Sequence, residues 1–242
     1  MEELSGGNMG PVHRDGQDVL RVAGPWTPTV HRLLRQLRDR GVEGVPEPRG
    51  LNDDGRERLE YLPGEVPAYP MPDWVWGEDA LVSSARLLRR IHDASASADR
   101  EGPWRSPAHE PVEVICHNDF ATYNLVFRDG VVVGVIDWDF ASPGPRLWDL
   151  AYLAYRIVPL TAADHADGFD DDERWRRCDL LLDSYGSTAA RSDLVAMLVT
   201  RLRELAEFSD KMSVDLHRRD LADHAVGYRR DADWLRGWLA AP

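Results

Sequence analysis

The sequence predicts an α+β protein with two lobes, a small β-rich N-terminal lobe followed by a larger, mostly helical C-terminal lobe. Short apolar runs separated by Gly, Asp-Gly and Pro-Gly signals fill the first part of the chain, which is typical of antiparallel hairpins. Further along, apolar residues recur every three or four positions over several long segments, which is typical of amphipathic helices. We therefore expect an N-terminal lobe at residues 1–62 and a C-terminal lobe at residues 63–242.

The N-terminal lobe is predicted to start with a glycine-rich turn and a hairpin. The turn spans residues 6–10, and the hairpin joins residues 12–14 to residues 19–22 around Asp15-Gly16. Glycines let backbone N–H groups approach a phosphate closely, but a glycine run near a terminus is also often just a flexible segment. Both interpretations stay open for the three candidate phosphate-binding residues Gly6, Gly7 and Asn8.

A helix is predicted next, because Thr27 is a favourable N-cap, Pro28 suits a first helical turn and Gly41 suits a C-terminal end. Its apolar stripe consists of Val30, Leu33, Leu34 and Leu37. At residues 59–65 a strand ends in a Pro-Gly turn, where we expect the chain to leave the N-terminal lobe.

The C-terminal lobe is predicted to combine one hairpin with several helices. The expected elements, in chain order, are a loop at 67–77, a helix at 79–95, a strand at 112–116, a hairpin with strands at 125–127 and 131–136, a loop at 141–146, and helices at 147–155, 172–186, 192–210 and 214–239.

The most informative segment of the chain contains three polar residues at strand ends. Asp119 is followed five residues later by Asn124, and Asp137 comes 13 residues beyond that, at the end of an apolar run. A single Asp or Asn in a loop is more often a turn former than a functional group. Here the predicted hairpin would bring all three together. A carboxylate that accepts a hydroxyl proton, with amide and carboxylate oxygens that hold magnesium, is the set that phosphoryl transfer needs.

In protein kinases these groups belong to the His-Arg-Asp-x-x-x-x-Asn loop and the Asp-Phe-Gly motif. This sequence has His117-Asn118-Asp119 in the first motif and Ile136-Asp137-Trp138-Asp139 in the second. That form resembles the aminoglycoside phosphotransferase family, the antibiotic- and choline-kinase branch of the protein-kinase-like fold, whose short members include trifolitoxin-immunity-type proteins. The resemblance implies a two-lobed kinase-like fold and phosphate transfer from ATP or GTP with Mg²⁺.

The resemblance assigns a role to each residue of the motifs. Asp119 would accept the proton of the acceptor hydroxyl, and His117 would hold the loop through backbone contacts. Asn124 and Asp137 would bind the metal and, through it, the nucleotide. Asp139 could hold a second metal or cap the next turn, and we favour the cap.

The family pattern also implies a nucleotide site in the N-terminal lobe. The backbone of Glu60, Tyr61 and Leu62 would lie against the adenine edge, although a plain strand-to-turn exit fits those residues equally well. Arg21 occupies the strand position of the phosphate-binding lysine, and the segment 23–28 resembles a branch of the family with Arg at that place. The kinase pattern pairs that lysine with a helix glutamate, whereas the predicted helix offers His31 and no Glu before Glu43.

Three further residues are expected to be structural. His92 ends its helix as Leu-x-x-His does in the family, and we expect it to support the catalytic loop from the core. Asp149 is expected to tie its helix to the same loop. Cys116 lies within an apolar strand and should fill space there.

The composition and charge of the chain narrow the classes of molecule that it is expected to bind. The formal charge of −13 opposes binding to nucleic acid or anionic membranes and is compatible with a cationic small-molecule substrate. No apolar run reaches the ~20 residues of a membrane span, and the N-terminus lacks signal-peptide features. Two cysteines are too few for a disulfide framework, so we expect a cytoplasmic protein, either monomer or homodimer.

The acceptor substrate is not predicted. Acidic residues at helical spacing could hold substrate amines, but such runs are usually solvated: Glu204, Glu207 and Asp210. Three functions stay open, namely a kinase for an aminoglycoside-like or other antibiotic, a kinase for a metabolite such as choline, a sugar or a nucleoside, and a catalytically degenerate immunity or binding protein.

Overall fold

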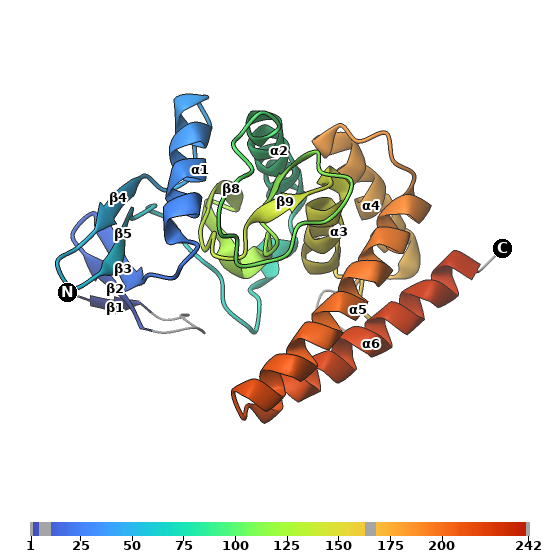
Figure 1. The fold of residues 1–242 in the computed structure, drawn as a ribbon. Helices are drawn as coiled ribbons and strands as arrows, with labels where there is room; N and C mark the ends of the chain where they lie inside the picture. The colour runs from blue at the N-terminus through green and yellow to red at the C-terminus, as the bar shows by residue number, and fades with distance from the viewer. Residues whose placement is uncertain (1, 5–10, 163–167, 241–242) are drawn as a thin grey trace.

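The computed structural model describes residues 2–4, 11–162 and 168–240, and its arrangement confirms the predicted two-lobed α+β fold (Figure 1). An antiparallel sheet lies at one end and long helices lie at the other, with the segments that carry the two polar motifs between them. The predicted phosphate-binding residues Gly6, Gly7 and Asn8 lie outside the described residues.

The N-terminal sheet has five strands in the order β1-β2-β3-β5-β4. The strands are β1 (Glu2–Leu4), β2 (Val12–Asp15), β3 (Asp18–Val22), β4 (Pro48–Leu51) and β5 (Arg56–Glu60). The predicted hairpin is present as β2 and β3. Strand β5 pairs with β3 as well as with β4, so residues far apart in the sequence become direct neighbours in the centre of the sheet.

Helix α1 (Thr27–Asp39) connects β3 to β4 and packs its predicted apolar stripe into the core. The N-cap prediction was wrong by one residue, because Trp26 is the N-cap and Thr27 is the first helical residue. The Thr27 hydroxyl instead accepts a hydrogen bond from the Gly24 N–H at 2.9 Å, which closes the turn before the helix.

The middle of the molecule contains α2 (Glu78–Ser95), which follows the short helix η1 (Asp73–Trp76). Helix α2 packs against the hairpin of β7 (Leu125–Arg128) and β8 (Val131–Val135). The hairpin turn uses Asp129 and Gly130, both with positive φ, as an Asp-Gly turn requires.

The expected loop at 141–146 contains a strand. Strand β9 (Ser142–Gly144) pairs antiparallel with β6 (Val114–Cys116), so that Ile115 faces Pro143. A two-stranded ribbon tolerates proline because each strand has an edge that needs no N–H donor. The prediction failed because Pro and Gly normally indicate a loop.

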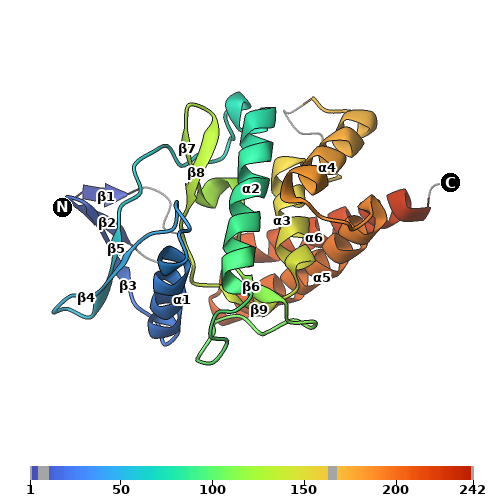
Figure 2. The same ribbon diagram turned by 90° about the horizontal axis from the view of Figure 1, so that it is seen from above.

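Helices α3 (Arg146–Ile157), α4 (Asp171–Tyr185), α5 (Arg191–Asp215) and α6 (Arg219–Ala240) complete the C-terminal lobe. Helices α5 and α6 run side by side as a long pair along one flank (Figures 1 and 2). The rings of Trp234 and Trp238 contact each other in a tilted arrangement, and Trp175 of α4 joins them at the edge of the core. Across the described ranges, no helix is both long and apolar enough to cross a bilayer.

The two lobes meet where the β7–β8 hairpin approaches the loop after α1. The Val135 N–H donates to the Gly44 carbonyl at 2.9 Å. Gly44 has a φ of +84°, and a side chain there would collide with the Val133 carbonyl. Glycine is therefore required at this contact for both its backbone angle and its size.

Gly44→Ala should destabilise the protein more than Gly41→Ala, the matched control. Gly41 also has a positive φ, +78°, but a Cβ there meets nothing within 4 Å. Both variants carry a left-handed alanine, worth about 1–2 kcal/mol. The steric clash should add about 1–3 kcal/mol at Gly44 alone. Urea unfolding followed by tryptophan fluorescence measures the free energy of unfolding of both variants. Equal losses would show that the contact between the lobes can rearrange to make room for the Gly44→Ala side chain.

Candidate active site

Asp119 and Asn124 lie on the loop between β6 and β7, and they contact each other directly. The short helix η2 (Thr122–Asn124) brings Asn124 back toward the start of the loop. The Asn124 amide donates to the Asp119 backbone carbonyl at 2.9 Å and to the Asp119 carboxylate at 2.8 Å. Because the amide nitrogen makes both bonds, the Asn124 side-chain oxygen is the atom that can serve as a metal ligand.

His117 ties this loop to the end of β8. Its Nδ1 accepts the Asp119 N–H at 3.2 Å, so Nε2 carries the proton and donates to the Ile136 carbonyl at 3.0 Å. Burial lowers the pKa of His117 despite the negative charges of Asp149, Asp119 and Asp137. The imidazole is thus neutral and makes the backbone contacts expected of it. The residue that follows Ile136 is Asp137, so His117 sets the distance between the two motifs.

Asp149, on α3, holds the start of the loop. Its carboxylate accepts the backbone N–H groups of His117 at 2.6 Å and Asn118 at 2.8 Å, and His92 Nε2 contacts it at 3.2 Å. Burial alone would raise the pKa of Asp149, but the hydrogen bond and charge of His92 and the charge of Arg201 outweigh burial and keep it below the ordinary value. His92 and Asp149 therefore have the supporting positions expected from the sequence.

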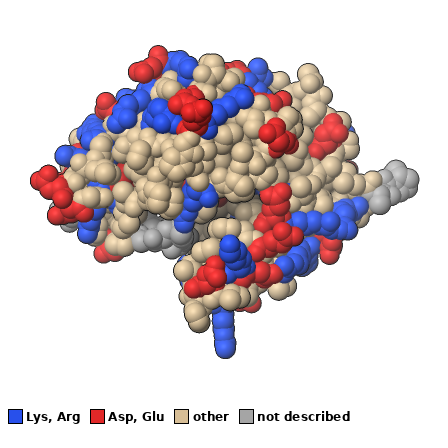
Figure 3. Space-filling model, viewed as in Figure 1, with Lys and Arg blue, Asp and Glu red and all other residues tan. Residues whose placement is uncertain are grey.

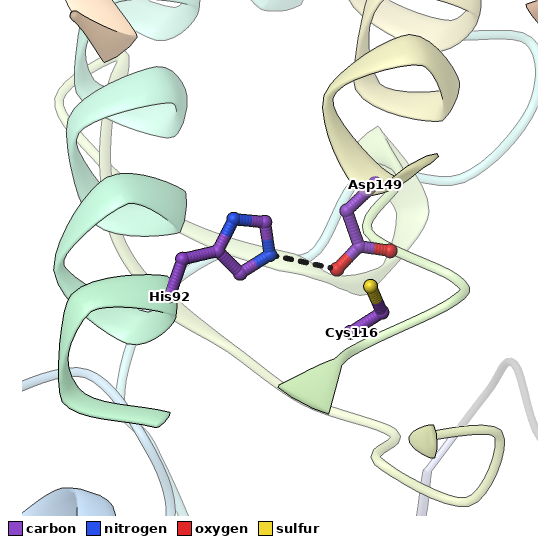
Figure 4. A group of neighbouring side chains, drawn as sticks. All are labelled: His92, Cys116 and Asp149. Atoms are coloured by element: carbon purple, nitrogen blue, oxygen red, sulfur yellow. Dashed lines mark hydrogen bonds and ion pairs between the residues drawn. The ribbon is translucent and has the colours of Figure 1, made fainter. Parts of the chain in front are cut away.

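His92, Cys116 and Asp149 form a compact buried group whose ligand atoms lie within 4.8 Å of one another (Figure 4). Their polar atoms have protein partners, since His92 also contacts the Tyr185 hydroxyl at 2.7 Å and the Cys116 thiol donates to the Pro145 carbonyl at 3.3 Å. Burial and the charge of Asp149 raise the pKa of Cys116 well above its usual range. A protonated thiol is a poor metal ligand, so this group is a support for the loop.

Asn118 occupies the place of the kinase arginine and has a φ of +64°, as Asp137 does at +61°. The Asn118 amide donates to the Phe140 carbonyl and the Ser142 hydroxyl, and its oxygen accepts from Trp148. Left-handed backbone is costly for residues other than glycine, and asparagine tolerates it best. Both motifs therefore include backbone conformations that the surrounding bonds must hold.

Arg21 reaches from β3 across the lobe boundary to the second motif. Its Nη1 donates to Asp137 at 2.8 Å and its Nη2 donates to Asp139 at 2.6 Å, while its Nε contacts Glu57. The position of the phosphate-binding lysine thus faces the predicted metal ligands. Glu57 was not among the predicted site residues, and it is the partner that the sequence did not reveal.

The predicted metal ligands differ in their surroundings. Asp137 keeps 39% of its side chain exposed, and its Oδ1 contacts Arg21. Asp139 is 15% exposed, and its two oxygens accept from Arg21 and, at 3.3 Å, from Arg105. Burial raises the pKa of Asp139, against the lowering charge of Arg21. The oxygens of Asn124 and Asp137 fit Mg²⁺, whereas Asp139 is committed to arginines.

Glu60, Tyr61 and Leu62 lie where β5 leaves the sheet. The Glu60 N–H donates to Glu47 and the Tyr61 N–H donates to Gln17, and the Glu60 carboxylate contacts Arg38 at 2.8 Å. Within the described parts of the chain, no protein group accepts from the Leu62 N–H. That donor is available to a nucleotide base at this edge.

Asp119 is connected to a cluster of tyrosines and one arginine. The Tyr123 hydroxyl donates to Asp119 at 2.7 Å and lies 3.0 Å from the Tyr152 hydroxyl, which accepts from Arg156 at 2.9 Å. Burial, with Tyr152 and the charge of Asp119, raises the pKa of Tyr123 well above its usual range, so it remains a donor. The Arg156 guanidinium also lies over the rings of Tyr123, Tyr152 and Tyr155.

Two of the acidic residues of α5 contact side chains of neighbouring elements at the surface. Glu204 contacts His109 at 2.9 Å, and Asp210 contacts Arg229. Acidic and basic side chains are interleaved along α5 and α6, and the surface is hollowed between this helix pair and the body of the protein (Figure 3). These contacts agree with the solvated-face interpretation.

Fold and site define a kinase-like phosphotransferase architecture. Residues 98–181 match the model of the phosphotransferase enzyme family. The chain is also similar to the trifolitoxin immunity protein of Rhizobium leguminosarum bv. trifolii, with 34% identity over 96% of this chain and 93% of that protein. The chain belongs to the aminoglycoside phosphotransferase family, as its motifs predict.

Solved structures show the same fold at low identity. A choline/ethanolamine kinase family protein from Mesorhizobium loti aligns with a TM-score of 0.68 and 16% identity, over 100% of this chain and 88% of that one. The amicoumacin kinase hAmiN, solved with AMP-PNP, Ca²⁺ and Ami, aligns with a TM-score of 0.64 and 12% identity, over 92% and 84%.

Asp149→Asn should destabilise the protein by about 3–5 kcal/mol, because an amide nitrogen would face backbone donors in a buried site. Asp93→Asn on α2 is the matched control; Asp93 is 49% exposed and pairs with Arg89 and Arg146, so its loss should cost less than about 1 kcal/mol.

The same variant tests the pH dependence of stability. Since the folded-state pKa of Asp149 is lowered, its stabilisation is present above the unfolded-state value of ~3.9 and is lost as pH falls below it. Urea unfolding between about pH 5 and pH 3 should show a smaller acid loss in Asp149→Asn than in the wild type. Parallel curves would contradict the role of this carboxylate.

Proposed function

We propose that this protein is a magnesium- and nucleotide-dependent O-phosphotransferase that inactivates a toxin or antibiotic by phosphorylating one of its hydroxyl groups. The convergence of Asp119, Asn124, Asp137 and Arg21 on one site between the lobes carries the proposal. A chain with a merely kinase-like fold would have no need to keep these groups together. ATP is the expected donor, with GTP as the alternative.

The acceptor hydroxyl would donate its hydrogen bond to Asp119, which takes the proton as the transferred group leaves the nucleotide. Tyr123 and Asn124 each donate to one Asp119 oxygen, which fixes the carboxylate plane before the acceptor arrives. When bound, Mg²⁺ at Asn124 and Asp137 would neutralise phosphate charge. Arg21 is the cation that contacts Asp137, and its planar guanidinium suits contact with two phosphate oxygens.

The immunity function of the relative supports a toxic acceptor. That protein is named for immunity to trifolitoxin and is similar to this chain over nearly its full length. A phosphotransferase site offers a direct chemical basis for immunity, because a phosphate adds charge and bulk to a toxin. We extend this to the present chain without assigning the toxin.

The surroundings of Asp119 favour an acceptor that is not a quaternary amine. Choline-type cations are bound by the faces of aromatic rings. Here the Arg156 guanidinium already lies over the rings of Tyr123, Tyr152 and Tyr155. One of these, Tyr123, is the tyrosine that contacts the Asp119 carboxylate. The shared fold permits a choline kinase, but the covered rings make that alternative weaker than a kinase for a toxin or antibiotic. A sugar or nucleoside kinase remains the second candidate.

The proposal is tested first by calorimetry with ATP and GTP in the presence and absence of Mg²⁺. It is then tested by transfer of radiolabelled phosphate to a panel of hydroxyl-bearing antibiotics, toxic peptides, sugars, nucleosides and choline. Absence of nucleotide binding at millimolar concentration would favour a degenerate immunity protein. Transfer to choline ahead of the toxins would overturn the acceptor assignment.

Asp119→Ala should abolish phosphate transfer and leave nucleotide affinity nearly unchanged, because the carboxylate contacts the acceptor and not the nucleotide. Loss of a general base typically lowers the rate ~100- to 10,000-fold. Asp129→Ala, on the β7–β8 turn, is the control and should leave transfer unchanged. Steady-state kinetics and calorimetry on the same preparations separate the two effects, and near-normal turnover in Asp119→Ala would remove Asp119 from this role.

A further inference from the structure

The guanidinium of Arg21 is anchored at its Nε by Glu57, which is buried in the N-terminal lobe. Arg21 on β3 and Glu57 on β5 are direct cross-strand partners in the sheet register. Their side chains therefore share one face of the sheet. Only 1% of Glu57 is exposed to solvent, so this carboxylate needs partners inside the protein.

The second partner of Glu57 is His31 on α1. The His31 Nε2 lies 2.8 Å from Glu57 Oε1, and the other carboxylate oxygen contacts Arg21. Burial alone would raise the pKa of Glu57, yet the His31 hydrogen bond and the Arg21 charge keep it below the ordinary value. Both oxygens of an ionised carboxylate are thus used, one by the helix and one by the arginine.

We propose that Glu57, held by His31, positions Arg21 for the nucleotide phosphates and so replaces the lysine–glutamate pair of other kinases. The proposal rests on the proposed phosphotransferase function. The glutamate here comes from a sheet strand, and the helix contributes a histidine that fixes it.

The division of donors on Arg21 explains why such an anchor is needed. Its Nη1 and Nη2 lie on Asp137 and Asp139, the acidic residues of the second motif. Glu57 holds the Nε edge of Arg21 inside the N-terminal lobe, so the position of the guanidinium does not depend on Asp137 and Asp139 alone. With Nε fixed on Glu57, the two Nη donors that contact Asp137 and Asp139 are the ones that would be offered to phosphate oxygens.

The test compares binding of Mg-AMP-PNP, which has phosphates, with binding of adenosine, which has none. Glu57→Gln should weaken Mg-AMP-PNP roughly 10- to 100-fold, the effect of losing one charge-assisted hydrogen bond, and should leave adenosine affinity within about twofold. Arg21→Ala should show the same selective loss. Glu47→Gln, an exposed carboxylate that pairs with Arg49, is the matched control and should change neither affinity.

A second pair of variants keeps the test decisive if Glu57→Gln folds poorly. His31→Leu removes the donor and should weaken Mg-AMP-PNP selectively, whereas His31→Gln keeps an N–H donor and should restore affinity. An equal loss of affinity for Mg-AMP-PNP and adenosine would show that Glu57 and His31 have a structural role only. Unchanged Mg-AMP-PNP affinity would overturn the proposal directly. A wild-type protein that binds neither ligand would instead refute the phosphotransferase function itself.

Discussion

The candidate site depends most on one buried carboxylate, that of Asp149, which accepts two successive backbone N–H groups of the loop that carries Asp119. Backbone donors at the start of this loop turn away from regular pairing, so they need an acceptor inside the protein. Asp149 supplies it from α3, and His92 on α2 contacts the same carboxylate at 3.2 Å. With the loop fixed to two helices, His117 can in turn fix the end of β8, and the two acidic motifs acquire a defined separation.

The N-terminal lobe is joined to this framework by ion pairs as well as by packing. Arg21 contacts one carboxylate of its own sheet and two of the C-terminal lobe. A single side chain therefore links the two strands of the sheet to the second motif. Ion pairs of this kind are costly to bury unless every charge is matched. The same contacts place a permanent cation beside the predicted metal ligands. Lobe geometry and electrostatics at the site are therefore set by the same contacts.

The sequence was sufficient for the fold class, the predicted hairpins and the presence of the helices, because periodicity and turn residues are local signals. It placed the last break between helices too early, at residues 211–213, whereas α5 runs to Asp215 and α6 starts at Arg219. It was insufficient for β9, where Pro143 and Gly144 imitate a loop, and for the partner of Arg21. Glu57 lies 36 residues from Arg21 and pairs with it only because β5 inserts beside β3. A usable signal did exist, since Glu57 lies two residues before Leu59 and therefore shares the buried face of the strand with it. A charged residue at such a position predicts a buried pair, but not which partner it takes.

Charge near the reacting groups differs from the charge of the whole molecule, and this decides how the acceptor should be sought. A net charge of −13 points toward cationic substrates when the chain is considered as a whole. Locally, Arg21 contacts Asp137, and Arg156 is connected to Asp119 through three hydrogen bonds by way of Tyr123 and Tyr152. Short-range pairs outweigh a distant surface field at physiological ionic strength, because exposed charges are screened beyond ~8 Å. We therefore expect the two arginines to favour phosphate and neutral hydroxyls at the site, and the acidic exterior to disfavour nucleic acid.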